Sequence, residues 1–136
     1  MTNTHLLTAS WDHYPSAAKA YLLALTQLIY EVASEQQFGE VAASLKWGQV
    51  SFTVKGGSSV RLDWTINAPE QVALYFICHT RLVDTFKQLY GEQLILQGNR
   101  AIILPLTQPI PINILRHSIK LTFSYQRIKH LPLLGC

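Results

Sequence analysis

The sequence predicts an α+β fold in a single domain spanning residues 1–136, with an antiparallel sheet of about five strands and helices packed on it. Two observations predict this class. Apolar residues recur at helical spacing near both ends of the chain, and the middle of the chain alternates apolar and polar residues or forms short apolar runs. The length suits one hydrophobic core. The expected order is α-β-β-β-α-β-β-α.

The first helix is expected over residues 15–36, with Pro15 near its start. Its buried stripe follows a 3.6-residue period and consists of Leu22, Leu25, Leu28, Ile29 and Val32. Glu31 and Glu35 fall on the opposite side of this helix, one turn apart.

Two strands follow, over residues 49–54 and 60–66, because apolar and polar residues alternate strictly in both. The glycine-rich segment between them predicts a hairpin. Pairing apolar residues with apolar residues favours a three-residue loop, Gly56 to Ser58. That loop predicts the pairs Val54 with Val60, Phe52 with Leu62, and Val50 with Trp64.

Before the first of these strands, Leu45 and Trp47 are out of phase with the apolar positions that follow. A bulge at Gly48 restores the phase, since glycine tolerates the backbone that a bulge requires. This interpretation places Trp47 in the core. It also places Lys46 on a polar sheet face together with Gln49, Ser51, Arg61 and Asp63.

The remaining elements are a central strand over residues 71–78, a short helix over 80–90, a hairpin turning at Gly98–Asn99 and a final helix over 111–131. The central strand is apolar on both faces, which predicts that Cys78 lies in the core. The inner stripe of the final helix is expected to contain Ile114, Leu115, Ser118, Leu121, Thr122, Tyr125 and Ile128.

Several strings in this order resemble the YdhG-like domain family, a bacterial family of unknown function. They are "LKWGQVSFTVKGG", "ALYFICHTRLVDTF", "LYGEQLILQGNRAI" and "YQRIKHLPLLG", which together run from about Leu45 to Gly135. The resemblance implies a fold similar to that of frataxins, and some members are described as iron chaperones that support iron–sulfur assembly.

The resemblance makes iron the one candidate cofactor, because frataxins present clustered carboxylates on the first helix and the adjoining strand. Iron ions of this kind prefer oxygen ligands. In this sequence the corresponding candidates are Asp12, Glu31, Glu35 and Glu40. The net charge of +3 is a departure from the acidic surface of that class.

Basic residues beside aromatic ones suggest a different site, a pocket for a small anionic ligand. No acidic residue occurs from Leu94 to the end, whereas five lysines and arginines do. The candidate ligand-binding residues are Lys46, Trp47, Arg61, Tyr75, Arg81, Arg100 and Lys129. The open alternative is that these cations form structural salt bridges, for example with Asp63 or Asp84.

Other classes of function have less support in the sequence. Neither a Ser-His-Asp nor a Cys-His spacing stands out, so a non-enzymatic binding or accessory protein is expected, with no catalytic residue assigned. Nucleic-acid binding is an alternative that a charged fraction of only 14% disfavours. No apolar run reaches ~18 residues, and no secretory signal is expected, because the first residues show no basic region followed by an apolar one; a cytoplasmic protein without a membrane partner is therefore expected. A protein partner and a homo-oligomer stay open.

Overall fold

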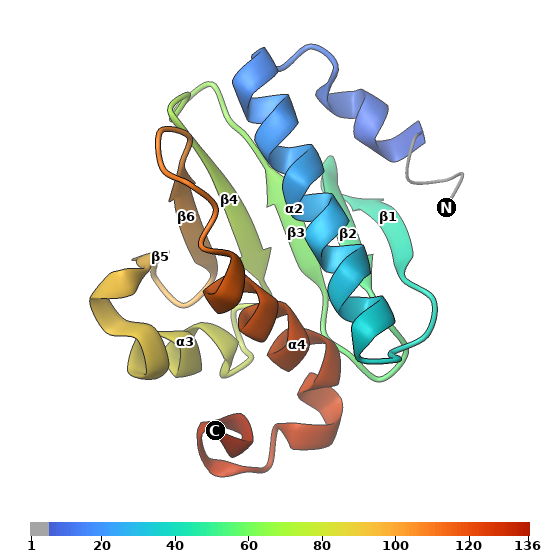
Figure 1. Ribbon diagram of the computed structural model, residues 1–136, viewed down its shortest axis with the longest axis vertical. Helices are drawn as coiled ribbons and strands as arrows, with labels where there is room; N and C mark the ends of the chain where they lie inside the picture. Colours follow the sequence, from blue (N-terminus) through green and yellow to red (C-terminus); the bar gives the residue numbers. More distant parts are fainter. Residues whose placement is uncertain (1–5) are drawn as a thin grey trace.

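The computed structural model describes residues 6–136 as two layers, helices on one side and a sheet on the other (Figure 1). Helices α2 (Ser16–Glu35) and α4 (Ile112–Ile128) lie across one face of the sheet, and α3 (Leu82–Tyr90) lies beside α4. Residues 6–8 are also helical, and three short 3₁₀ segments lie within residues 6–136: η1 (Ala9–Trp11), η2 (Gly91–Gln93) and η3 (Pro132–Gly135). The α+β class with an antiparallel sheet is therefore confirmed.

In the described part of the chain the sheet has six strands in the order β1-β2-β3-β4-β6-β5, and every neighbouring pair is antiparallel. β1 to β4 pair in chain order, whereas α3 carries the chain over to β5, which lies at the edge beyond β6. The bounds of the strands are β1 (Ala42–Lys46), β2 (Gln49–Thr53), β3 (Val60–Asp63), β4 (Gln71–Phe76), β5 (Ile95–Gln97) and β6 (Ala101–Pro105).

The sixth strand corrects the interpretation of Gly48 as a bulge. Residues 42–46 form a separate strand, and Trp47 and Gly48 are the two turn residues between the paired Lys46 and Gln49. Both have positive φ, 50° and 77°, which is the geometry of a two-residue type I′ hairpin. The turn takes Trp47 out of the core and leaves its side chain 88% exposed. Lys46 reaches the predicted polar face all the same, because directly paired residues point to one side of a sheet.

The register between β2 and β3 is shifted by two residues from the predicted one, with Phe52 opposite Val60 and Val50 opposite Leu62. A shift of two keeps every side chain on its expected face. The loop is longer than predicted because it docks on α4. The backbone N–H of Ser58 donates to the carbonyl of Thr122 at 2.9 Å, so residues up to 58 are drawn away from the strand ladder.

The core lies between the helices and the inner sheet face. All five residues of the predicted α2 stripe are buried, and in α4 the predicted Leu115, Ser118, Leu121, Thr122 and Tyr125 are buried as well. The rings of Phe76 on β4 and Phe86 on α3 meet edge to face with centroids 5.2 Å apart. Trp11 of η1 is buried in the same core.

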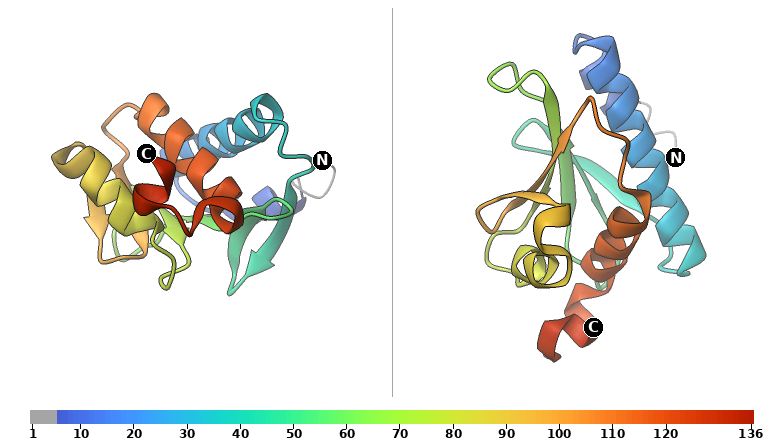
Figure 2. Two further views of the ribbon diagram at one scale, coloured as in Figure 1. Left: turned by 90° about the horizontal axis from the view of Figure 1, so that it is seen from below. Right: turned by 60° about the vertical axis from the view of Figure 1, so that its left-hand side comes forward.

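The other face of the sheet is not covered by α2, α3 or α4, which Figure 2 (left) shows above the strands. This face is called the outer face below. Within residues 6–136, no helix combines the length and the apolar character needed to cross a membrane.

Candidate functional site

The outer face carries a row of polar side chains that crosses the middle of the sheet. Ser51 on β2 pairs with Arg61 on β3, and Arg61 pairs with Tyr75 on β4. Directly paired residues project to the same side, so this row is fixed by strand register alone. Lys46 and Gln49 project to the same side at the end of the β1–β2 hairpin.

Two arginines and two aromatic rings form a chain of contacts on this face. The guanidinium carbon of Arg61 lies 5.2 Å from the ring centroid of Trp47 and 5.8 Å from that of Tyr75. Arg100, in the β5–β6 turn, places its guanidinium carbon 6.0 Å from the Tyr75 ring. Distances of this size are those of cation–π contacts. Burial raises the pKa of the Tyr75 phenol, Asp63 raises it further, and the two arginines oppose that rise.

The backbone presents Trp47 in an unfavourable conformation. A bulky residue at φ 50° is rare, because Cβ crowds the following carbonyl in the left-handed region. Asparagine, aspartate or glycine is the usual residue at this position of a type I′ turn. A solvent-exposed tryptophan held there beside Arg61 gains little from packing. Such outliers cluster at binding sites, which makes Trp47 a candidate ligand contact.

Two cavities include residues of the outer face, and the second also extends to the end of α4. The first, about 430 Å³, is lined by Trp47, Gln49, Arg61, Phe76, Cys78 and Arg100. The second, about 550 Å³, includes Lys46, His79 and Lys129 together with several hydroxyl groups in its lining. They adjoin where Lys46 precedes Trp47 along the chain. Neither lining contains an aspartate or a glutamate, so both cavities are electropositive.

The second cavity also contains an unpaired polar atom. Ser58 is only 4% exposed, and among the residues that the structure describes its hydroxyl is the one buried side-chain polar atom without a hydrogen-bond partner. Buried polar groups of proteins are nearly always paired, so an orphan hydroxyl calls for an explanation. A buried ordered water beside this hydroxyl is one.

Asp63 is the carboxylate on the outer face, where Gln49 also donates a hydrogen bond to it at 3.4 Å, but it forms no ion pair with the cations there. Between residues 6 and 136, ion pairs within 4.0 Å involve only Lys19 and Arg116 as cations. Asp63 instead accepts a hydrogen bond from the Tyr14 hydroxyl at 2.7 Å, and Asp84 accepts one from Gln88 at 2.9 Å. The salt-bridge alternative to an anion pocket therefore finds no ion pair in the described part of the chain.

Arg81 does not join this set. It precedes α3, and its guanidinium donates from Nη2 to the carbonyl oxygen of Leu131 at 3.1 Å. Its backbone N–H donates to the Tyr125 hydroxyl at 3.0 Å. Arg81 therefore fastens the C-terminal segment to α3 and α4.

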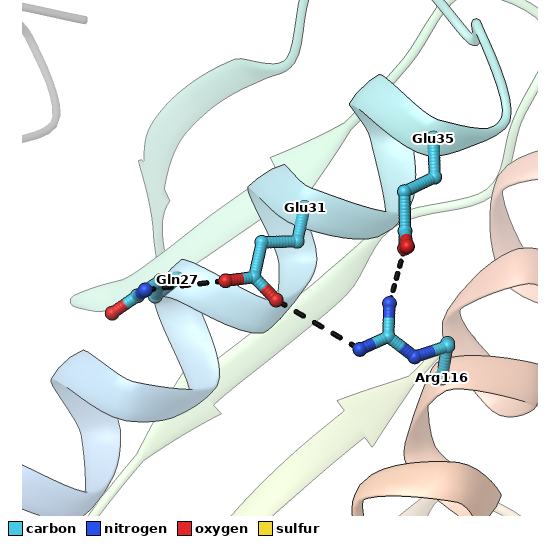
Figure 3. A network of polar contacts seen from close by, with 4 residues as sticks. All are labelled: Gln27, Glu31, Glu35 and Arg116. Carbon is cyan, nitrogen blue, oxygen red and sulfur yellow. Dashed lines mark hydrogen bonds and ion pairs between the residues drawn. The ribbon is translucent and has the colours of Figure 1, made fainter.

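The four carboxylates suggested for iron are dispersed. Asp12 pairs with Lys19, whereas Glu31 and Glu35 share Arg116 of α4 (Figure 3), with 3.8 Å between Arg116 Nη2 and Glu31 Oε2. Glu40 lines a separate cavity of about 670 Å³ beside the end of α2, together with Glu31. Among residues 6–136, no three metal-ligating His, Cys, Asp or Glu side chains come together.

Most residues that line the cavities were not predicted as part of a site, and Cys78, Gln49 and Ser58 show why. Cys78 is exposed, contrary to its predicted place in the core, because β4 ends at Phe76. Alternation places Gln49 on the correct face, but its side chain is uncharged and so did not suggest an anion site. Ser58 had been assigned to a turn, and its burial against α4 depends on a contact distant in sequence.

Comparisons of the chain with protein-family models, with curated proteins and with solved structures found no match. Support for a function therefore comes from the residues and the geometry described above.

Proposed function

We propose that this chain is a YdhG-like domain that binds a small anionic ligand on the outer face of its sheet, as a non-enzymatic binding or accessory protein. One observation carries the proposal. Lys46, Arg61, Arg100 and Lys129 line two adjoining cavities, and no carboxylate of the described residues forms an ion pair with any of them. Cations gathered without an ion-pair partner favour an anionic ligand.

The chemistry of the two cavities suggests how such a ligand is held. The forked guanidinium groups of Arg61 and Arg100 suit a carboxylate or a phosphate, because each can donate two parallel hydrogen bonds. The exposed indole of Trp47 offers a flat surface to a planar part of the ligand. The volumes, about 430 and 550 Å³, are those of sites for small metabolites.

The family assignment and the frataxin-like description rest on the four sequence strings and on the α+β arrangement. The iron-chaperone alternative has no further support, because Glu31 and Glu35 already share Arg116. The nucleic-acid alternative has one supporting observation. An exposed tryptophan next to arginines on an open sheet is a surface on which the bases of a single strand can stack.

The test is an anaerobic thermal-shift titration of the intact chain with inorganic phosphate, citrate, a nucleoside monophosphate, Fe(II) and a short single-stranded oligonucleotide. A ligand at 100 times its dissociation constant adds about 2.7 kcal/mol to the free energy of unfolding, which is readily detected. We expect at least one of the small anions to stabilise the protein.

The matched variants are Arg61→Gln and Arg127→Gln, which remove the same charge at different places. Arg61 lies on the outer face, whereas the guanidinium of Arg127 lies 6.0 Å from the Phe38 ring, on the helix side of the sheet. Losing a charge-assisted hydrogen bond of about 1.5–3 kcal/mol predicts roughly 10- to 100-fold weaker binding in Arg61→Gln alone. Equal weakening in both variants, or stabilisation by Fe(II) alone, contradicts the proposal. Stabilisation by the oligonucleotide without any small anion favours the nucleic-acid alternative.

A further inference from the structure

Three reactive side chains from separate elements meet at the end of α3, away from the cavities of the outer face. They are Tyr90, the last residue of α3, His117 on α4, and Cys136 after η3. The sulfur of Cys136 lies 3.6 Å from Nε2 of His117. On the other side of the imidazole, the Tyr90 hydroxyl is hydrogen-bonded to Nδ1, and the two rings meet at 86°.

The backbone around Cys136 is shaped to bring the thiol to this histidine. Leu133 and Leu134 both have positive φ, 49° and 51°, a conformation that L-residues with bulky side chains rarely adopt. Leu134 is only 2% exposed, so its burial holds the turn. The guanidinium of Arg81 donates a hydrogen bond to the carbonyl oxygen of Leu131 at the start of the same turn. The segment is therefore fixed by burial and by a hydrogen bond to α3.

The surroundings of His117 favour its neutral imidazole, which can accept a proton. Burial, and then the charge of Lys120, lower the pKa of His117, so the imidazole is neutral at neutral pH. Burial and Cys136 raise the pKa of the Tyr90 phenol, which keeps its proton. With the imidazole proton on Nδ1, donated to the Tyr90 oxygen, Nε2 offers its lone pair to the Cys136 thiol. A nucleophile, a base and a third group that orients the base form the arrangement of an activated cysteine.

We propose that Cys136 is an activated thiol that exchanges with small disulfides, with His117 as its base and Tyr90 as a positioning residue. His117 Nε2 takes the proton of the Cys136 thiol, and the thiolate attacks one sulfur of a disulfide RS–SR. The S–S bond of the reagent breaks as the bond between Cys136 and the attacked sulfur forms. The leaving thiolate RS⁻ takes the proton from His117 and departs as RSH, so the protein thiol is oxidised and one half of the disulfide is reduced.

Cys78 is an internal control for this proposal. It is also exposed, but it follows β4, where its carbonyl accepts a hydrogen bond from Asn99. Within residues 6–136, no histidine lies within hydrogen-bonding distance of its sulfur. At pH 7 an ordinary thiol is about 3% ionised, so a base can accelerate the reaction of its thiol by at most about 30-fold.

The experiment follows the reaction of the intact protein with 4,4′-dithiodipyridine at pH 7 and assigns each modified cysteine by mass spectrometry. A neutral disulfide is chosen because Cys78 lines a cavity with two arginines that would attract an anionic reagent. We expect Cys136 to react at least about fivefold faster than Cys78. In His117→Gln this advantage should disappear while the rate at Cys78 stays unchanged. In Tyr90→Phe we expect the pH at which the reaction rate of Cys136 is half-maximal to change. The corresponding pH for Cys78 should stay the same.

Leu134→Ala separates activation from simple exposure. It loosens the turn without touching the three reactive groups, so it moves Cys136 away from His117 and further into solvent. Activation by His117 predicts a slower reaction of Cys136 in this variant, whereas control by exposure predicts a faster one. A faster reaction in Leu134→Ala, equal rates at the two cysteines of the wild type, or an unchanged Cys136 rate in His117→Gln each overturns the proposal.

Discussion

Replacing Trp47 by asparagine tests the most consequential difference between the sequence-based expectation and the structure. A tryptophan in the core costs about 3–5 kcal/mol when its side chain is removed. In the structure Trp47 is 88% exposed, so only about an eighth of a side chain of roughly 250 Å² is buried. That area corresponds to about 0.8 kcal/mol, and the exposed contact with Arg61 adds about 0.5 kcal/mol.

The backbone offsets this loss. At a φ of 50° an ordinary L-residue carries a penalty of roughly 1–2 kcal/mol, much of which asparagine avoids. We therefore expect Trp47→Asn to change the free energy of unfolding by less than about 1 kcal/mol. The same substitution should remove binding of a planar anion on the outer face.

The assay is guanidinium chloride unfolding followed by far-UV circular dichroism. Trp11→Ala is the matched control, because Trp11 is 1% exposed and its loss should cost about 3–5 kcal/mol. A loss above about 2 kcal/mol in Trp47→Asn would refute the hairpin turn at Trp47–Gly48. It would instead support a buried indole behind a bulge.

Three other predictions follow from single contacts and are measured by the same unfolding assay. Gly57→Ala should cost about 1–3 kcal/mol, because an added Cβ would lie 2.6 Å from the carbonyl oxygen of Phe123. Arg116→Ala should cost at most about 1 kcal/mol and nothing in 1 M NaCl, since the ion pairs of Arg116 are partly exposed. Burial, and then the hydrogen bond to Asp63, raise the pKa of Tyr14, so its contribution is complete below pH ~10 and is lost progressively above it, because the unfolded chain ionises before the folded protein does. Tyr14→Phe should therefore lose about 1 kcal/mol at pH 8 and show a weaker dependence on pH between 10 and 12.

Each of these has a control. Gly56→Ala has open space apart from the end of the Arg127 side chain but a φ of 82°, so it reports backbone strain without the clash. If it costs more than Gly57→Ala, the close approach to α4 is wrong. A loss in Arg116→Ala that persists in 1 M NaCl means that packing, and not charge, is responsible. Tyr21→Phe removes another phenol whose pKa is raised by burial. If the hydrogen bond to Asp63 matters, Tyr14→Phe should lower the free energy of unfolding at pH 8 by more than Tyr21→Phe does.

Alternation in the sequence predicted the faces of the strands but not their partners. A shift of two residues leaves every side chain of β2 and β3 on the same face, so no pattern within the strands distinguishes the two registers. The docking of Ser58 on Thr122, more than 60 residues away, decides between them. The dipeptide Trp47–Gly48 misled for a related reason. A large apolar side chain such as that of tryptophan is normally expected in the core, and only the pairing of β1 with β2 shows that Trp47 lies in a turn.

The candidate site shows the same division. Alternation in the sequence predicts that Lys46 and Arg61 share a face, whereas only the pairing of β3 with β4 places Tyr75 beside Arg61. Alternation could not place Arg81, because Arg81 does not lie in a strand. Its guanidinium contacts Leu131 in the C-terminal segment, whose path depends on the burial of Leu134. The meeting of His117 with Cys136 joins residues from α4 and the terminal turn at no recognisable spacing. Sites assembled from several elements require tertiary structure to be seen.

The order of the strands has a consequence for how the chain folds and opens. β1, β2 and β3 each pair with the next strand, so short connections close these contacts, whereas β6 must return to β4 past α3 and β5. Local pairings form early and distant ones late, so the first half of the sheet is expected to assemble before the second. Arg61 belongs to the early half and Arg100 to the late half. A ligand bound by both would tie the halves together, and it should slow amide hydrogen exchange in β6 more than in β2.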